Sequence, residues 1–478
     1  MSCYTFSARC YAICQLTTKK RFRKMEEKIK KLSEKIIRLL EEKKIQEVKE
    51  IVDDFYPTEF SEITDYFPLE QTIEIFKLIK DDERIAELLS ELNTELQSNI
   101  MEALGKEKAS DILEEMDTDE AADFLGEIAP QESRELLDLM PKEEAEGIEE
   151  LLKYEENTAG SIMNNEFVAL PEDLTAEDAI NKIRELSPEA ETIYYVHIVD
   201  KREKLIGVIS LRDLIMANPK AKISEFMEED VVSVLDTEDQ ETAARIIADY
   251  DFLAIPVIDK KGTLLGIITV DDIIDVLQEE VTEDIHKMVG SSEVYEDKLI
   301  KASPLTRAKA RLPWLLVCMA GEILSGSVIK LHSDILQTVM AMAFFIPIIM
   351  AMGGNVGAQS STIAVRGLAT GQLRIDELWY NIWTETKVGS LIGIIVGIII
   401  ALVALVWQDD YILGLVIGLS LCLTMITAAT IGTLLPLIFT KIRIDPAIAA
   451  GPFITTTVDV GSLLIYFSLG TFLFKVFS

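Results

Sequence analysis

Residues 447–474 read AIAAGPFITTTVDVGSLLIYFSLGTFLF, an apolar segment that holds one charged side chain, Asp459. A helix needs about 20 apolar residues to cross roughly 30 Å of hydrocarbon, so this segment is long enough to span a membrane. An ionised carboxylate at that depth costs at least about 2.5 kcal/mol unless a cavity, a cation or a partner receives it. We therefore expect Asp459 to face a polar interior rather than lipid.

Four more apolar segments precede this one, at residues 312–329, 335–357, 388–407 and 412–439. None of the five segments contains Lys, Arg or His, so no basic side chain lies at a depth where it could pair with Asp459. Alternate connections carry the basic residues Arg307, Lys309, Arg311, Arg366, Arg374, Lys387, Lys441 and Arg443. Basic connections stay in the cytoplasm, which predicts a cytosolic N-terminal region and a C-terminus outside the cell.

Other oxygen-bearing side chains accompany this carboxylate in the predicted spans. Thr455–Thr457 precede Asp459, Asn355 lies in GGNVGAQSS, and Asp445 lies in RIDPA before the last span. Mg²⁺ prefers oxygen ligands and gives up its waters reluctantly, while the sulfur and imidazole ligands that suit zinc or copper are absent from these positions. The residues therefore favour a pathway for a divalent cation, and they leave Mg²⁺, Mn²⁺, Co²⁺ and Ca²⁺ open.

Three further features of the spans concern their packing and shape. Glu322, in CMAGEILSG, has two interpretations: it lines the pathway, or it faces a cavity between subunits. The glycine-rich run 353–357 follows Pro347, a combination that predicts local unwinding of the helix. The GxxxGxxxG pattern at 389–397 is typical of close helix packing rather than of ion contact.

The part of the chain before the spans is strongly acidic. Of the 81 acidic and 46 basic side chains, 9 and 10 respectively lie from Ser303 onwards, which leaves 72 and 36 for residues 1–302. Such a charge repels polyanions and attracts cations, so we expect no binding of nucleic acid. The five cysteines show neither a disulfide framework nor a zinc spacing. Residues 1–24 are expected to be a disordered extension, unless translation begins at Met25.

An internal repeat organises residues 161–280. LIGVISLRDLI at 205–215 returns as LLGIITVDDII at 264–274, a shift of 59 residues. Each unit predicts a short strand, a helix, two apolar strands and a closing helix. This pattern resembles a pair of cystathionine β-synthase (CBS) domains, modules that bind adenosine nucleotides or ions as regulators. The resemblance implies a nucleotide, ATP for example, at Ser210, Arg212, Asp213 and Phe252. In the second unit Asp272 belongs to an acidic helix, which argues against a nucleotide there.

Residues 25–158 have a helical pattern with short turns, as at Asp117–Asp119, Ala129–Pro130 and Met140–Pro141. Units such as ILEEMDTDEAADFLGEI predict short helices stacked in a superhelix. Asp119 and Asp123 share one helical face, and a second stripe follows the repeat at Asp272, Asp275, Glu279 and Glu283. Like charges at these spacings repel unless a cation screens them, whereas the ordinary interpretation of most such acids is a solvated surface.

The whole chain resembles the MgtE family of magnesium transporters. The match rests on RLPW at 311–314, PIIMAMGGNVGAQSS at 347–361, DPA at 445–447 and PFITTTVDVG at 452–461. Residues 1–24 and Glu322 do not belong to the pattern. The implied multi-domain fold is an all-α superhelical N domain (25–158), tandem α/β CBS domains (159–220 and 221–278), a connecting helix (279–302) and a five-helix transmembrane domain (303–478).

This resemblance also implies a function and its residues. It implies a homodimeric channel of the cytoplasmic membrane that takes up Mg²⁺ along a pathway with Asp459 as principal ligand, Asn355 along the route and Asp445 near the inner mouth. It further implies that cytosolic Mg²⁺ holds the N and CBS domains together and closes the pore through the connecting helix. The implied regulatory ligands are Asp119, Asp123, Asp239, Glu241, Asp251, Asp272, Asp275, Glu280 and Glu283.

Two other function classes receive less support. An enzyme is disfavoured because the chain has no GxxxxGK[ST] phosphate loop, no DKTG sequence of an ion pump and only His197, His286 and His332. A CBS-gated anion channel is disfavoured because the apolar segments carry Asp459 and no Arg or Lys. A different divalent cation within the same architecture stays open, because Mn²⁺, Co²⁺ and Ca²⁺ accept the same ligands.

Overall fold

The computed structural model describes residues 29–64, 66–186, 190–288, 290, 303–373, 377–449 and 451–477. The chain forms two compact units, Met1–Ile274 and Asp275–Ser478, and each is considered by itself. The predicted extension over residues 1–24 lies outside the described residues, as do residues 291–302 of the predicted connecting helix.

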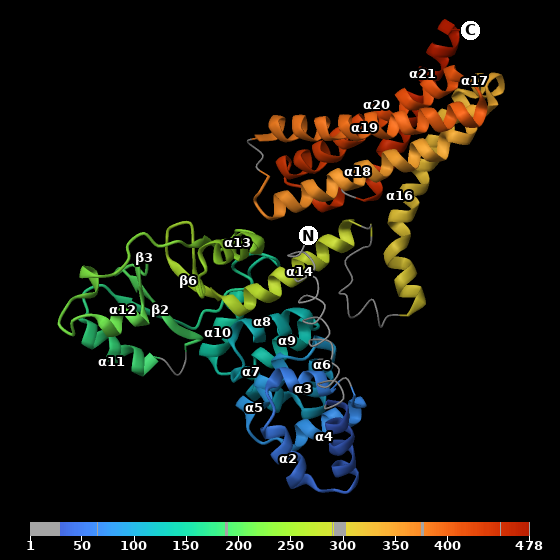
Figure 1. Cartoon of the computed structure of the whole chain (residues 1–478). Coiled ribbons are helices and arrows are strands. Elements are labelled where there is room, and N and C mark those ends of the chain that lie inside the picture. The colour runs from blue at the N-terminus through green and yellow to red at the C-terminus, as the bar shows by residue number, and fades with distance from the viewer. Residues whose placement is uncertain are drawn as a thin grey trace, which may run out of the picture. The chain divides into compact units, whose positions relative to one another are not determined.

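The first unit begins with short helices stacked on one another (Figure 1). After a helix over residues 29–41 they are α2 (Ile45–Asp53), α3 (Pro57–Thr64), α4 (Leu69–Leu78), α5 (Asp82–Ser90), α6 (Thr94–Leu104), α7 (Lys106–Glu114), α8 (Thr118–Glu127), α9 (Pro130–Leu137) and α10 (Lys142–Leu151). Contacts commonly join helices two apart, as between α3 and α5 or α5 and α7. Fully buried side chains such as Phe60, Phe76 and Ile85 fill the interior between them. This confirms the predicted stack of short helices.

Two similar α/β modules follow in the same unit. The first module contains β1 (Phe167–Pro171), α11 (Ala176–Leu186), β2 (Thr192–Val199), β3 (Leu205–Ser210) and α12 (Leu211–Met216). A 3₁₀ turn, η2 (Ile223–Glu225), connects the two modules. The second module contains β4 (Val234–Leu235), α13 (Gln240–Tyr250), β5 (Ala254–Ile258), β6 (Leu264–Thr269) and α14 (Val270–Met288). In each sheet the first two strands are parallel and the last two antiparallel. The predicted order of strands and helices is confirmed in both modules.

The residues of the repeat shape turns and close contacts. Asp200 Oδ1 accepts backbone N–H bonds from Arg202 and Lys204, and Asp259 Oδ1 accepts the equivalent bonds from Lys261 and Thr263. These bonds hold the charged turn between the last two strands of each module. The two aspartates, which recur at the repeat spacing of 59 residues, therefore have a structural role.

The repeated glycines allow the two modules to interlock. A Cβ built on Gly207 would lie 2.7 Å from Sδ of Met227, and one on Gly266 would lie 2.8 Å from Sδ of Met163. Met163 precedes the first sheet and packs on a strand of the second, while Met227 precedes the second sheet and packs on a strand of the first. Each module therefore closes over its neighbour, which requires glycine at both positions.

Among its described residues, the second unit contains five helices long and apolar enough to cross a membrane. Its elements are α16 (Pro304–Leu331), α17 (Ser333–Thr338), η3 (Met340–Phe345), α18 (Ile346–Ala369), α19 (Leu378–Gln408), α20 (Tyr411–Lys441), η5 (Pro446–Ala449) and α21 (Pro452–Phe477). Helix α20 packs against α18, α19 and α21, and the four helices lie close together in Figure 1. All five predicted spans are confirmed, although the last begins at Pro452 rather than at Ala447.

The predicted unwinding at 353–357 is wrong, because α18 is continuous from Ile346 to Ala369. Pro347 lies in the first turn of the helix, where its missing N–H costs no hydrogen bond. The glycines serve packing instead: a Cβ on Gly353 would lie 2.7 Å from Oγ of Ser462, and one on Gly357 would lie 2.9 Å from Cγ2 of Ile454. The irregular backbone of this span is the 3₁₀ segment η3, which precedes the glycines.

Candidate functional site

Asp459 lies on the second turn of α21 and is 5% exposed. Its carboxyl group lies beside that of Glu322 on α16. A Cβ built on Gly354 of α18 would lie 3.9 Å from Asp459 Oδ1, so the carboxyl also adjoins this helix where a side chain is missing. Asp459 is therefore buried between α16 and α18.

The other predicted pathway oxygens are arranged differently. Asn355 follows the buried Gly354 on α18, and its side chain is exposed when one chain is considered alone. Thr456 and Thr457 donate their hydroxyls to backbone carbonyls one turn earlier, at 2.6 and 2.8 Å. The donated proton leaves the lone pairs of each hydroxyl oxygen available, so these residues can still accept bonds from the waters of a hydrated cation.

Asp445 precedes the last span and has an internal cationic partner. Its Oδ1 accepts the N–H of Ala447 at 2.7 Å, which starts the 3₁₀ turn η5. Its Oδ2 lies 2.7 Å from Nζ of Lys287, near the end of α14. Lys287 also pairs with Glu283 one turn earlier on its own helix. Burial opposes the charge of Lys287, but the two carboxylates outweigh burial and raise its pKa.

Close packing surrounds this ion pair. Met288 packs against Val365 and Ala447, and a Cβ built on Gly451 would lie 1.9 Å from the carbonyl oxygen of Met288. Asp284 follows Glu283 on α14. Burial of its carboxyl group, and then the charges of Asp445 and Glu280, raise the pKa of Asp284 to about 6. The end of α14 thus lies directly on the residues that lead into the last span.

A second acidic group lies in the first unit, around Asn164. The Nδ2 atom of this fully buried residue donates to Asp119 Oδ1 at 3.2 Å and to Glu191 Oε2 at 3.1 Å. Burial, and then the charges of Asp272 and Glu191, raise the pKa of Asp119 well above its ordinary value. The helical N-terminal part and the α/β modules therefore meet at a group of carboxyls.

Several members of this group were not singled out from the sequence. Burial is the first cause that raises the pKa of Glu120 and that of Glu191, each to about 7, and neighbouring carboxylates add to the effect. Burial together with the charge of Asp271 also raises the pKa of Asp117. Glu191 is 72 positions from Asp119, so no local spacing could have indicated their proximity. Asp117 was recognised only as a turn residue, and Glu120 only as one acid among many.

The remaining predicted regulatory residues have more ordinary surroundings. Asp123 is exposed although Asp119 is 9% exposed, so these two carboxyls do not share one environment. Asp239 caps α13 by accepting the N–H of Glu241, and Asp251 ends that helix with a φ of 54°. Asp275 is exposed and Glu280 half-buried on α14. Among the described residues, no three His, Cys, Asp or Glu side chains come together closely enough to enclose a metal ion.

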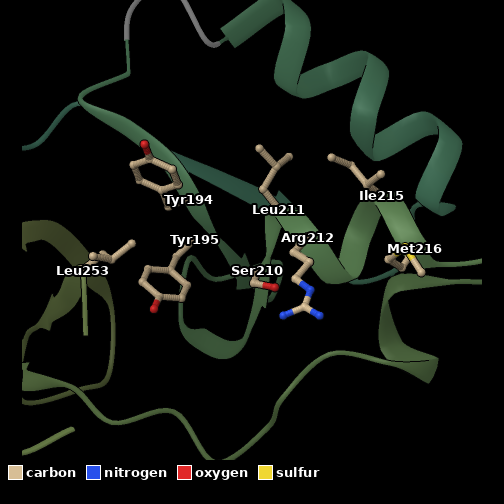
Figure 2. A pocket seen from close by; sticks show the side chains of 8 residues that line it. All are labelled: Tyr194, Tyr195, Ser210, Leu211, Arg212, Ile215, Met216 and Leu253. Atoms are coloured by element: carbon tan, nitrogen blue, oxygen red, sulfur yellow. The ribbon is translucent and has the colours of Figure 1, made fainter. Parts of the chain in front are cut away.

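The predicted nucleotide site coincides in part with a cavity of about 500 Å³ between the α/β modules. Figure 2 shows Ser210 between Tyr195 and Arg212, with Leu253 of the second module nearby. Ser210 Oγ donates to Asp213 Oδ2 at 2.6 Å and accepts the N–H of Asp213, so this pair caps α12. Phe252 stacks on Tyr250, with ring centroids 5.3 Å apart.

Two aromatic residues of this cavity, Tyr194 and Tyr195, were not identified from the sequence. They lie on consecutive positions of β2, and both line the cavity. The signal that could have found them is the aromatic pair itself, since aromatic side chains are the usual partners of a stacked base.

Comparison with known proteins gives three family models that together span most of the chain. They are MgtE, described as a divalent cation transporter, over residues 346–469; the MgtE intracellular N domain over residues 55–157; and the CBS domain over residues 159–220 and 223–279.

Curated relatives are similar over most of the chain. The magnesium transporter MgtE of Bacillus subtilis is 36% identical over 437 residues, which cover 91% of this chain and 96% of the relative. The magnesium transporter MgtE of Thermus thermophilus is 38% identical over 323 residues, covering 68% and 71%. A crystal structure of the cytosolic domain of the Mg²⁺ channel MgtE in complex with ATP is 36% identical, covers 51% of this chain and 99% of that chain, and has a TM-score of 0.49.

Proposed function

Because the chain belongs to the MgtE family of divalent cation transporters, we propose that it carries Mg²⁺ across the cytoplasmic membrane through its five-span domain. The observation that carries the proposal is Asp459, a carboxyl that is 5% exposed in a domain whose five apolar segments (312–329, 335–357, 388–407, 412–439 and 447–474) contain no Lys, Arg or His. Uptake needs no coupled reaction, since an inside-negative potential favours entry by about 2.3 kcal/mol per charge per 100 mV. The first unit lies in the cytosol and the C-terminus outside.

In this pathway Asp459 binds the passing cation, and neutral oxygen atoms form hydrogen bonds with the water molecules around it. Asn355 and the threonine hydroxyls contact the waters that Mg²⁺ retains, because this ion gives up its first shell reluctantly. Asp445 attracts the cation at the inner end of the route once its ion pair with Lys287 separates. This division of roles requires a strong carboxylate ligand at depth and weaker oxygen contacts on either side.

The test of the pathway is Mg²⁺ flux into proteoliposomes carrying Asp459→Ala. We expect the variant to fold and to lose uptake, whereas Asp334→Ala, which removes a carboxyl from the short helix α17, should transport like the parent. Parallel assays with Mn²⁺, Co²⁺ and Ca²⁺ establish the selectivity. Parental Mg²⁺ flux through Asp459→Ala would remove this residue from the pathway.

We also propose that cytosolic Mg²⁺ closes the channel. The group around Asn164 supports this, because the raised pKa values of Asp119, Glu120 and Glu191 reflect burial beside other acids. A divalent cation that bridges such carboxyls favours the compact arrangement, and its loss favours separation. A nearly complete switch needs about 5.5 kcal/mol of preferential binding, which several weak sites can supply together.

The gate is tested by the triple variant Asp272→Asn, Asp275→Asn, Glu283→Gln. Its flux should persist at internal Mg²⁺ concentrations that close the parent channel, because the row of carboxylates on α14 is neutralised. Three exposed carboxyls of the N-terminal helices provide a matched triple control in Glu95→Gln, Glu102→Gln and Glu107→Gln. Closure of the α14 variant at the parental concentration is the result that contradicts the sensor.

An adenosine nucleotide is a second ligand that the cavity between the modules favours. Ser210 and Arg212 provide a hydroxyl and a guanidinium, and Tyr195 provides an aromatic surface for a base. Titration of the full chain with ATP should show saturable binding that Arg212→Ala weakens about tenfold, the loss expected for one charged phosphate contact. Arg245→Ala, on the exposed part of α13, is the control, and equal binding by both variants would exclude the site.

Finally, we propose that the channel is a homodimer. In a single chain Glu322 and Asn355 are exposed although both belong to predicted spans, and lipid is an unfavourable environment for either. A second copy that covers these surfaces would remove them from lipid. The mass of the purified protein in detergent, measured by light scattering, should correspond to two chains.

A further inference from the structure

Glu322 is the only ionisable side chain other than Cys318 in the segment 312–329, and the packing of α16 on α21 brings its carboxyl group beside that of Asp459. The two residues belong to α16 and α21, which are 137 positions apart at this point but pack against each other. The contact joins a residue with no assigned role to the carboxyl proposed as the principal ligand of the pathway.

The backbone at this crossing favours the contact. A Cβ built on Gly321 would lie 1.7 Å from Cγ2 of Thr456, so any side chain at this position would push the two helices apart. Glycine therefore allows α16 to approach α21 closely, one residue before Glu322 and three residues before Asp459 along the respective helices. The close approach brings the carboxyl groups together.

A buried oxygen lies on the next turn of the same helix. Ser325 is 2% exposed, and its Oγ has no hydrogen-bond partner among the residues that the structure describes. Residues 322 and 325 are three apart and so are neighbours on one helical face. A buried hydroxyl without a partner indicates a position where a water molecule, or the water shell of an ion, completes its hydrogen bonding.

The charge of the pair determines which cation it suits. Two carboxylates in contact repel strongly at low dielectric, and the apolar segments offer no basic side chain to offset this. One divalent cation neutralises both, whereas one monovalent cation leaves a net negative charge. At a single carboxylate the comparison is reversed, because a monovalent cation neutralises its charge and a divalent cation leaves a net positive charge.

We propose that Glu322 is a second ion-binding residue of the pathway, and that the Glu322–Asp459 pair determines the preference for divalent over monovalent cations. The proposal rests on the proposed function, because it assumes that Asp459 lies on the route of the ion. It adds a specificity-determining residue to the proposed pathway.

The experiment compares Mg²⁺ and Na⁺ flux in proteoliposomes that contain the full-length protein. Glu322→Gln keeps the size of the side chain but removes its charge, and we expect the Mg²⁺ to Na⁺ flux ratio to fall by about tenfold or more. Glu322→Asp keeps the charge and should retain most of the ratio. Glu385→Gln is the matched control, since this carboxyl on α19 is bonded to Ser360 and lies outside the pair.

The outcomes separate this inference from the proposed function. If Asp459→Ala abolishes Mg²⁺ flux while Glu322→Gln keeps the parental ratio of Mg²⁺ to Na⁺ flux, the proposed pathway is supported and the proposed role of Glu322 is wrong. The same conclusion follows if Glu322→Gln lowers both fluxes equally, because a residue that only braces α16 against α21 affects transport without affecting selectivity. If Asp459→Ala keeps parental flux, the pathway itself is wrong. A fallen ratio in Glu322→Gln that Glu322→Asp restores supports the pair.

Discussion

The Nζ atom of Lys287 lies 2.7 Å from Oδ2 of Asp445, so an ammonium group on α14 binds the carboxylate that precedes the last span. The side chains of Lys287 and Asp445 are 17% and 32% exposed, which limits screening by water. The protein thus supplies its own cation at the position where a divalent ion was expected from the sequence. This ion pair holds the end of α14 beside the residues that lead into α21.

Replacing Lys287 with Met should loosen this contact. Without the ammonium, Asp445, Glu283 and Asp284 are left as neighbouring acids, and their repulsion opposes the docked position of α14. A partly exposed ion pair contributes about 1 kcal/mol, so flux at low internal Mg²⁺ should rise roughly fivefold. Lys475→Met, near the end of the chain, controls for the loss of one positive charge. Unchanged flux in Lys287→Met would show that the ion pair does not hold the gate.

The group around Asn164 should make the first unit sensitive to pH when Mg²⁺ is absent. The pKa of Glu191 is raised from 4.5 to about 7 in the folded protein, so between these values the folded state binds more protons than the unfolded state. Stability therefore decreases as the pH rises through this window. For each kcal/mol of unfolding free energy that is lost between pH 5 and pH 8, the unfolding temperature should be about 2–4 °C lower at pH 8.

The variant Glu191→Gln isolates this contribution, because glutamine cannot be ionised. Its unfolding temperature should depend less on pH than that of the parent protein, and added Mg²⁺ should reduce the difference between them. Glu177→Gln removes an exposed carboxyl from α11 and should leave the pH profile unchanged. Equal pH dependence in both variants would argue against a buried carboxyl group at this position.

His197 should have the opposite effect on stability. It is 1% exposed on β2, its ring lies 6.3 Å from that of Phe167, and burial lowers its pKa from 6.5 to about 4. The unfolded state binds the proton more readily, so stability decreases as the pH falls from 6.5 towards 4. His197→Leu should flatten this part of the curve in thermal unfolding, and a curve that stays as steep as the parental one would contradict the prediction.

The glycines at 389–397 should be needed for helix packing. A Cβ on Gly397 would lie 2.7 Å from the carbonyl oxygen of Gly418, and one on Gly393 would lie 2.8 Å from that of Cys422. Backbone atoms cannot rotate away, so Gly397→Ala should cost about 1–3 kcal/mol of stability in detergent. Gly326→Ala should have little effect, since nothing lies within 4 Å of its added Cβ. Equal thermal stability of the two variants would exclude a packing role.

The local pattern of residues in the sequence was sufficient to predict the secondary structure, but it was much less informative about which side chains form the candidate sites. The five spans follow from uninterrupted apolar residues, and the two α/β modules follow from the repeat of 59 residues. Asp459 could be singled out because a carboxyl in an apolar segment is costly. The prediction at 353–357 failed because glycines after a proline indicate both a loosened helix and a tightly packed one, and only the neighbouring helices decide between them.

The sequence by itself determined the elements, the architecture of the family and the carboxyl at depth, because periodicity and hydrophobicity act over neighbouring residues. Only the tertiary structure decided which charges meet: Lys287 with Asp445, Glu322 with Asp459, and Asp119 with Glu191 around Asn164. These pairs are separated by 72 to 158 positions along the chain. Their proximity depends on packing between elements, and no spacing within one element encodes it.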